Sequence, residues 1–174
     1  MYELVMKFRK AIIEAKDDNC FIDDNIFNDF PRGCCGDTCY LLAEYLQASG
    51  IETIYVCGED KDQSHAWLVV NNEMIKEPTK QFYEYPNEIK NVLANYGCTE
   101  YEGPIDITCY KADDVAKGLI IDITADQFGE DEVIINYMGD FHKNFDFSFA
   151  HEQNGLGNNS RLKWLYSIII NYLD

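Results

Sequence analysis

The residues that could carry out chemistry in this sequence lie in three short motifs, and the first contains a cysteine. The stretch Gly33-Cys34-Cys35-Gly36-Asp37 is a glycine-containing loop that leads directly into an amphipathic segment. A helix N-terminus carries partial positive charge and unpaired backbone N–H groups. A cysteine at that position is favoured as the nucleophilic thiolate, and the same N–H groups can hold an oxyanion. The motif therefore predicts a nucleophilic thiol at a helix start.

The other two motifs offer partners for this thiol. His65 opens the apolar segment 65–70, and Asp122 interrupts the apolar segment 119–124. A lone buried aspartate is unfavourable unless it is paired, and a histidine on a neighbouring strand would supply the partner. A cysteine at a helix start with a histidine and an aspartate on adjacent strands forms a nucleophile, base and orienting acid. We therefore predict a catalytic triad of Cys35, His65 and Asp122.

The elements that must position these residues follow from the spacing of apolar side chains. Helical spacing predicts a first helix up to residues 17–19, a second from 36 or 37 to Gly50, and a last one that Ser160 caps and that runs to Leu173. We expect the last helix to be buried, because it is apolar nearly all round. Strands are expected at 51–57, 65–70, 119–124, 133–138 and 145–149, a hairpin turn at Asn71-Asn72 with a return strand at 74–75, and short helices at 87–96 and 112–117.

The composition limits the function classes. The chain has 174 residues, enough for one domain, and 47% of them are hydrophobic, which excludes a disordered chain. Acidic residues outnumber basic ones by 31 to 14, and the net charge is −17. Nucleic acid and anionic membranes are therefore not expected as partners, whereas a basic partner is compatible. There is no apolar run of membrane-span length, and the seven cysteines are expected to be free thiols of a cytoplasmic protein.

The three motifs together resemble the transglutaminase-like branch of the papain-like cysteine enzymes. The resemblance covers Gly33-Cys34-Cys35-Gly36-Asp37, the helix that ends at Gly50-Ile51, His65-Ala66-Trp67 and Asp122-Ile123-Thr124, about half of the chain. It implies an α+β fold with the nucleophile helix packed on a small antiparallel sheet. It also places Cys35 on the nucleophile, His65 on the base and Asp122 on the orienting acid. The implied chemistry is acyl transfer at an amide bond, without a cofactor or metal.

The sequence departs from the family pattern at several points. His65 and Asp122 are 57 positions apart, so a single transglutaminase-like domain must contain an insertion at about 77–117. The motif Ile105-Asp106-Ile107-Thr108 repeats Ile121-Asp122-Ile123-Thr124, which leaves Asp106 as an alternative third member. Ile123 stands where the family has proline. No glutamine precedes Cys35 to assist an oxyanion, and the nearest amide is Asn28.

Other interpretations of the polar residues stay open. Cys34 could be the nucleophile instead of Cys35, and Cys39 is expected in the core. The pair Cys35 and Cys39 has the spacing of zinc ligands, but the remaining cysteines offer no clean second pair, so no metal is expected. His142 and His151 are expected at the surface, and Trp67 in the core.

Two function classes fit these observations. The first is a thiol-dependent hydrolase or acyltransferase acting on amide bonds, that is, a peptidase, an amidase or deamidase, or a transglutaminase-like enzyme. Its substrate would be a protein or peptide, possibly basic. The second is a non-catalytic acidic binding module, such as an immunity-type partner of a basic toxin or an inactive family member. The net charge of −17 favours the second class, and the three motifs favour the first.

Overall fold

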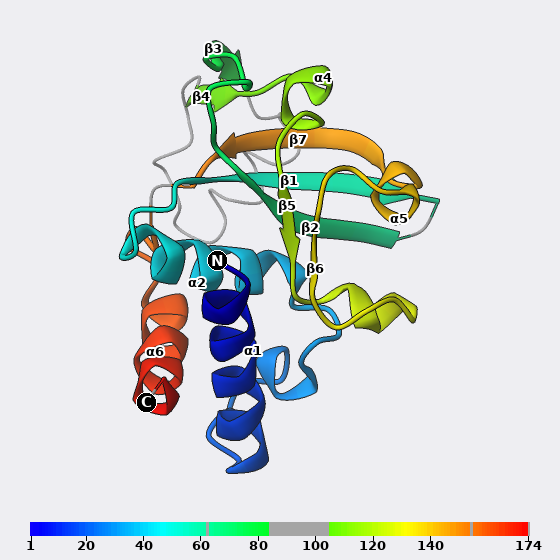
Figure 1. The fold of residues 1–174 in the computed structure, drawn as a ribbon. Helices are drawn as coiled ribbons and strands as arrows, with labels where there is room; N and C mark the ends of the chain where they lie inside the picture. Colours follow the sequence, from blue (N-terminus) through cyan, green and yellow to red (C-terminus); the bar gives the residue numbers. More distant parts are fainter. Residues whose placement is uncertain (62, 84–104, 154, 174) are drawn as a thin grey trace.

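A computed structural model describes residues 1–61, 63–83, 105–153 and 155–173, and these form a mixed α+β structure (Figure 1). The strands are β1 (Thr53–Asp60), β2 (Gln63–Val70), β3 (Thr79–Tyr83), β4 (Ile105–Cys109), β5 (Ile120–Asp122), β6 (Ile134–Asn136) and β7 (Asp146–Glu152). The helices are α1 (Tyr2–Asp17), α2 (Cys35–Gln47), α4 (Ala112–Val115), α5 (Asp140–Lys143) and α6 (Ser160–Ile169), with 3-10 turns η1 (Phe27–Asp29), η2 (Ala125–Phe128) and η3 (Ile170–Tyr172).

The seven strands form one sheet in the order β3-β4-β7-β1-β2-β5-β6, and every pairing is antiparallel. The α+β class is therefore confirmed. The central pair is the β1–β2 hairpin, in which Thr53 lies opposite Val70 and Gly58 opposite His65. The turn between these strands is tighter than the sequence predicts, because β1 continues to Asp60 and β2 already begins at Gln63.

Helices α1, α2 and α6 lie together on one side of the sheet (Figure 1). In α1 and α2, the apolar residues recur at helical spacing and are buried, for example Phe8 and Ile12 in α1 and Leu42 and Leu46 in α2. They pack with alternate strand residues such as Leu68 into the larger hydrophobic cluster. Helix α2 is thus held against the sheet by its apolar face.

The opposite face of the sheet carries a second, smaller cluster. Trp67 and Val69 alternate with Ala66 and Leu68 along β2, and they pack with Ile120 and Phe145 instead of with the long helices. The short helices α4 and α5 belong to this side of the molecule (Figure 1). Both clusters meet at the strands that hold His65 and Asp122.

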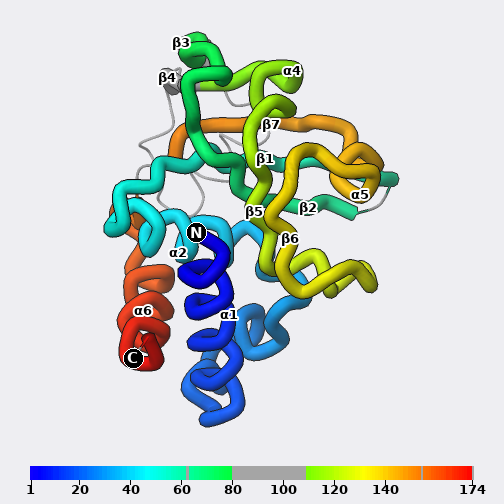
Figure 2. Tube along the Cα trace, viewed as in Figure 1, coloured from blue at the N-terminus to red at the C-terminus, as the bar shows by residue number. Residues whose placement is uncertain are grey.

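The predicted insertion does not separate the two strands that it interrupts. β2 and β5 are direct neighbours, with Leu68 opposite Ile121 and Val69 opposite Ile120. Between them the chain runs to the far edge of the sheet, where β3 pairs with β4 and Cys109 of β4 lies opposite His151 of β7 (Figure 2). The predicted helix at 87–96 lies outside the described residues.

Two local predictions are wrong. Residues 74–75 form no return strand, because the place beside β2 is taken by β5. The cap of α6 is Asn159 instead of Ser160, and its side-chain oxygen accepts a hydrogen bond from the Leu162 N–H at 3.0 Å. The prediction that α6 is buried holds for one face only, since Trp164 is 39% exposed. None of the helices in the described ranges has the length and apolar composition needed to cross a membrane.

Candidate active site

Cys35 is the first residue of α2, at the position that the sequence predicts for a nucleophile. The N-cap residue is Cys34, and its side chain accepts no capping hydrogen bond from the backbone N–H groups of the first turn. The N–H groups of the first turn are therefore not occupied by a capping side chain. Cys35 itself is half-buried, so its thiol combines a helix N-terminus with access from outside.

The neighbouring thiol has a different environment. Cys34 is 1% exposed, and its sulfur lies 3.6 Å from the Thr38 hydroxyl, which donates to it. Burial raises the pKa of Cys34 to about 12. A protonated, enclosed thiol is a poor nucleophile, so of the two adjacent cysteines the structure leaves Cys35 as the accessible one.

The acid in the first turn of α2 is neutralised by a salt-bridge network. Arg161 of α6 donates from Nη1 to Oδ2 of Asp37 at 2.7 Å and from Nε to Oδ2 of Asp24 at 2.6 Å. Asp24 also accepts backbone hydrogen bonds from Ile26 and Phe27, so it ties the loop before the nucleophile to α6. Through these bonds α6 fixes the beginning of α2 and offsets the negative charge of Asp37.

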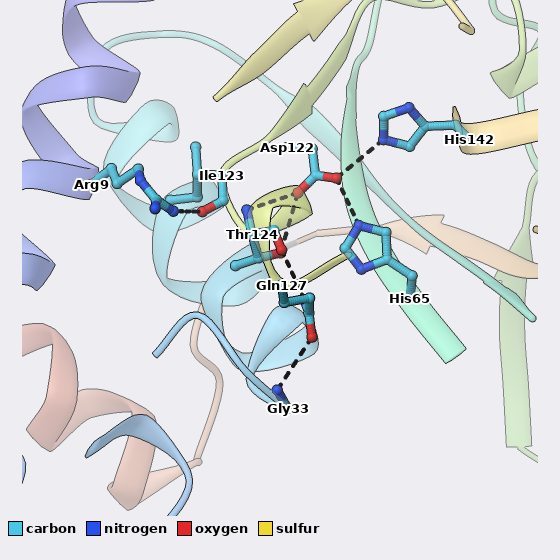
Figure 3. Close-up of polar contacts among 8 residues, drawn as sticks. All are labelled: Arg9, Gly33, His65, Asp122, Ile123, Thr124, Gln127 and His142. Carbon is cyan, nitrogen blue, oxygen red and sulfur yellow. Dashed lines mark hydrogen bonds and ion pairs between the residues drawn. The ribbon is translucent and has the colours of Figure 1, made fainter. Parts of the chain in front are cut away.

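His65 and Asp122 form a buried hydrogen-bonded pair. His65 Nε2 lies 2.7 Å from Asp122 Oδ2, and both side chains are buried (Figure 3). Burial opposes the protonation of His65, but the hydrogen bond with Asp122 and the nearby Cys35 side chain outweigh burial and raise its pKa to about 9. The raised pKa favours the protonated, positively charged imidazole at neutral pH.

The remaining nitrogen of His65 is the one available to the thiol. Because Nε2 is bonded to Asp122, Nδ1 is left, and it is buried without a hydrogen-bond partner among the described residues. The Cys35 side chain is close enough to raise the pKa of His65. His65 thus pairs with Asp122, and the Cys35 side chain lies near His65 without a hydrogen bond to Nδ1.

Each carboxylate oxygen of Asp122 accepts two hydrogen bonds. Its Oδ1 accepts from the Thr124 backbone N–H at 2.9 Å and from the Thr124 hydroxyl at 3.1 Å. Its Oδ2 accepts from His65 and also from His142 Nε2 at 3.1 Å (Figure 3). Although burial opposes ionisation, the bonds from His142 and His65 hold the pKa of Asp122 well below its ordinary value. The carboxylate is fixed in charge and in orientation.

His142 is buried, at 2% exposure, so the prediction of a surface histidine is wrong. His142 belongs to the short helix α5, and its ring forms a hydrogen bond with the buried Asp122 carboxylate. His151 is half-buried, since it stacks on Tyr55 with ring centroids 4.9 Å apart. Nothing in the local sequence around His142 marks it, because its partner is 20 positions away.

Aromatic rings enclose the imidazole of His65. The ring centroids of Phe128, Phe145, Phe141 and Trp67 lie 4.9, 5.4, 5.7 and 5.8 Å from it. They exclude water from the His65–Asp122 bond, which strengthens it electrostatically. Trp67 is 2% exposed, which confirms the expectation that it belongs to the core.

The alternative residues do not reach this arrangement. Asp106 lies on β4, and strands β7 and β1 stand between it and β2. Asn28 is exposed in η1. The amide beside the nucleophile loop is instead Gln127, whose Nε2 donates to the Thr124 carbonyl at 2.9 Å and whose Oε1 accepts from the Gly33 N–H at 3.3 Å (Figure 3). Gln127 therefore joins the loop after Asp122 to the loop before Cys35, over a separation that sequence patterns do not reveal.

The first helix also supports the loop that follows β5. Arg9 is buried, and it donates to the Ile123 carbonyl (Figure 3). It also donates to Asp126 Oδ2. Ile123, which stands where the resembled family has proline, is itself buried in the main cluster. The position of Asp122 is thus set from both sides, by Thr124 within the loop and by Arg9 from α1.

The same acid and histidines are also a conceivable ligand set for a metal ion. One ligand atom each of His65, Asp122 and His142 lies within 4.8 Å of the others. The separations of 2.7 and 3.1 Å are those of N–H···O hydrogen bonds, and these bonds account for the cluster without an ion. Among the described cysteines Cys39 is buried, as predicted, and all are free thiols, while Cys98 lies outside the described residues.

No family model, curated protein or solved structure matches this chain.

Proposed function

We propose that this protein is a thiol-dependent enzyme that acts on amide bonds through Cys35, His65 and Asp122. The observation that carries the proposal is the arrangement of His65, which bonds Asp122 through Nε2 and leaves Nδ1 for the thiol at the start of α2. A nucleophile, a base and a group that orients the base are the components of covalent acyl transfer. A nucleophile helix packed on an antiparallel sheet further supports a papain-like, transglutaminase-like fold.

In the first step Cys35 Sγ, as thiolate, attacks the carbonyl carbon of the substrate amide. A C–S bond forms, and the carbonyl electrons move onto oxygen to give a tetrahedral oxyanion. When the oxyanion collapses, the C–N bond breaks and His65 Nδ1–H protonates the leaving amine. Asp122 remains ionised throughout, and stabilises the imidazolium form that exists before this transfer.

The oxyanion would be held by the first turn of α2. The backbone N–H groups there have no capping side chain, and the partial positive charge of the helix end adds to their effect. The carboxylate of Asp37 does not repel the oxyanion with an unpaired negative charge, because Arg161 is bonded to that carboxylate.

In the second step His65, now neutral, accepts a proton from the acyl acceptor. Water as acceptor gives hydrolysis or deamidation, and a primary amine gives transamidation. The acceptor attacks the thioester carbon, the C–S bond breaks, and Cys35 leaves as thiolate to be paired again with protonated His65. Each proton that leaves His65 is thereby returned within one cycle.

A non-catalytic acidic binding module is the second candidate function. The net charge of −17 is the observation that favours it, since such a charge speeds association with a basic partner. The module would need neither the accessibility of Cys35 nor the pairing of His65 with Asp122.

The two functions can be separated by turnover of a fluorogenic peptide mixture and of glutamine-containing peptides with and without an added primary amine. We expect release of amine or ammonia by the native protein and none by the variant Cys35→Ala, with activity unchanged by a metal chelator. Turnover that survives Cys35→Ala, or that a chelator abolishes, would overturn the proposal.

A further inference from the structure

An aromatic shelf lies beside the nucleophile on the helix-covered side of the sheet. It consists of Tyr55 of β1 and Phe149 and His151 of β7. The Tyr55 ring lies 5.9 Å from that of Phe149 and 4.9 Å from that of His151, with interplanar angles of 17° and 13°. The rings are thus nearly parallel and stacked on one another.

The shelf adjoins the first turn of α2. A Cβ atom at Gly36 would lie 3.2 Å from the Tyr55 hydroxyl, so the residue next to Cys35 is in close contact with the shelf. Tyr40 of α2 packs on Tyr55, with ring centroids 5.2 Å apart. A substrate group seated on the shelf would therefore lie next to the thiol.

Phe149 is the open end of this shelf. It is 44% exposed, although Tyr55 is only 8% exposed. An exposed aromatic face can stack with a planar group and attracts a cation by its quadrupole.

Two unpaired carboxylates stand at the same end and on the same face. Phe149 lies opposite Cys57, and the next pair on that face is Glu59 opposite Asp146. Both acids are exposed, and neither forms an ion pair within the described ranges. Like charges directly opposite each other in a sheet are destabilising, and a bound cation would relieve that repulsion.

Glu59 and Cys35 both act on the thiol of Cys57, which lies between them on this face. Burial raises the pKa of Cys57, and negative charge at Cys35 and at Glu59 raises it further. Glu59 follows Gly58, the residue paired with His65, so Glu59 and His65 lie at the same end of the β1–β2 hairpin. The shelf, the two acids and the proposed triad therefore share one end of the sheet.

We propose that this shelf is the subsite for an arginine side chain of the substrate, whose planar guanidinium stacks on Phe149 and pairs with Glu59 and Asp146. Arginine fits better than lysine because a guanidinium is planar and can stack while it donates to carboxylates in its own plane. This inference rests on the proposed function and adds a substrate class to it.

The test is protection of Cys35 from iodoacetamide by blocked tripeptides of the form Ala-X-Ala, where X is arginine, lysine, phenylalanine or alanine. We expect the arginine peptide to protect at the lowest concentration, and salt to weaken its protection. Phe149→Leu keeps the apolar bulk without the ring, and should raise the half-protecting concentration about tenfold. Glu59→Gln and Asp146→Asn should each raise the half-protecting concentration of the arginine peptide. Glu73 is an exposed acid in the loop after β2, and Glu73→Gln should leave that concentration unchanged.

Phe147 provides the matched control. It lies on the same strand and is 38% exposed, but it faces the opposite side, where it lines a cavity with Val56 and Trp67. Phe147→Leu should leave the protection unchanged. Equal effects of the two Phe→Leu changes, or protection by the phenylalanine or alanine peptide as good as by the arginine peptide, would overturn the subsite. Failure of the proposed function gives a different result, because alkylation of Cys35 without peptide would then not depend on His65.

Discussion

The two faces of the sheet contribute to the site in different ways. On one face long helices pack on alternate residues of the central strands, and the first residue of α2 is the half-buried thiol of Cys35. On the other face short segments and aromatic side chains surround His65 and Asp122, which are buried. One face thus holds the half-buried thiol that we propose as nucleophile, and the other shields the charged pair that would activate it.

The difference shows how a small domain can hold a charged pair in its interior. The helix face needs only apolar burial, which is tolerant of volume-conserving change. The other face must satisfy a buried carboxylate completely, and Asp122 receives four donors for that purpose. Substitutions on the second face should therefore affect stability and reactivity together, whereas substitutions on the first should separate them.

The largest effect is expected where the two adjacent thiols of the helix face are exchanged for alanine. Cys35→Ala should abolish turnover, a loss of about 10³-fold or more, because no nucleophile remains. Its effect on the free energy of unfolding should be small, since the thiol is half-buried. Cys34→Ala should do the reverse, because it removes a buried sulfur bonded to Thr38 and leaves the nucleophile in place. Activity assays and urea denaturation of both variants measure these effects. If Cys34→Ala abolished turnover and Cys35→Ala did not, Cys34 would be the nucleophile.

On the shielded face, Asp122→Asn should lower the free energy of unfolding by about 3–5 kcal/mol and slow the reaction of Cys35. Both carboxylate oxygens accept hydrogen bonds, so the new amide group would face donors in either orientation. Asp106→Asn is the matched control, because β4 is separated from β2 by two strands. Urea denaturation followed by site-resolved labelling checks both, and a larger effect at Asp106 would contradict the geometry.

The stability of the protein should fall as pH rises from 6.5 to 9. The pKa of His65 is raised to about 9 from 6.5, so the folded state holds this proton more tightly than the unfolded state. The resulting stabilisation, about 3 kcal/mol, is complete below pH 6.5 and is lost through pH 9. The pKa of Asp122 is lowered, so its contribution is lost as pH falls below about 4. Urea denaturation across this range should show the fall in the native protein and a flatter profile in His65→Gln.

The smallest of these effects is expected at His142. His142→Leu removes one donor to the Asp122 carboxylate and should lower the free energy of unfolding by about 2 kcal/mol. His142→Gln places an amide N–H near the position of Nε2 and should recover part of that loss. If the two variants were equally stable, the hydrogen bond would not be what holds His142 in the interior.

Much of the fold follows from sequence pattern because the long elements are regular. The apolar spacing in α1 and α2 and the β-branched residues of β1 and β2 are each local signals, and these elements form close to where they are predicted. The missed features depend on distant partners. Residues 74–75 cannot form a strand beside β2 because β5 occupies that place, and the edge pair β3–β4 is set by pairing across the chain.

The site divides in the same way. The positions of Cys35, His65 and Asp122 could be predicted, because each stands at a helix start or within an apolar strand. His142 and Gln127 could not, because Asp122 is 20 positions from His142 and Gly33 is 94 positions from Gln127, and their local sequence is polar. The choice between Cys34 and Cys35 also needed the structure, since only burial distinguishes two adjacent thiols.

The central claim is most directly tested by labelling the native protein with iodoacetamide between pH 4 and 9 and following each cysteine by mass spectrometry, with His65→Ala in parallel. An activated pair predicts that Cys35 is labelled rapidly well below the pH of about 8.5 at which an ordinary thiol ionises, and that removal of His65 slows it. A Cys35 that stays unlabelled, or that is labelled at the same rate with and without His65, would contradict the proposed enzyme.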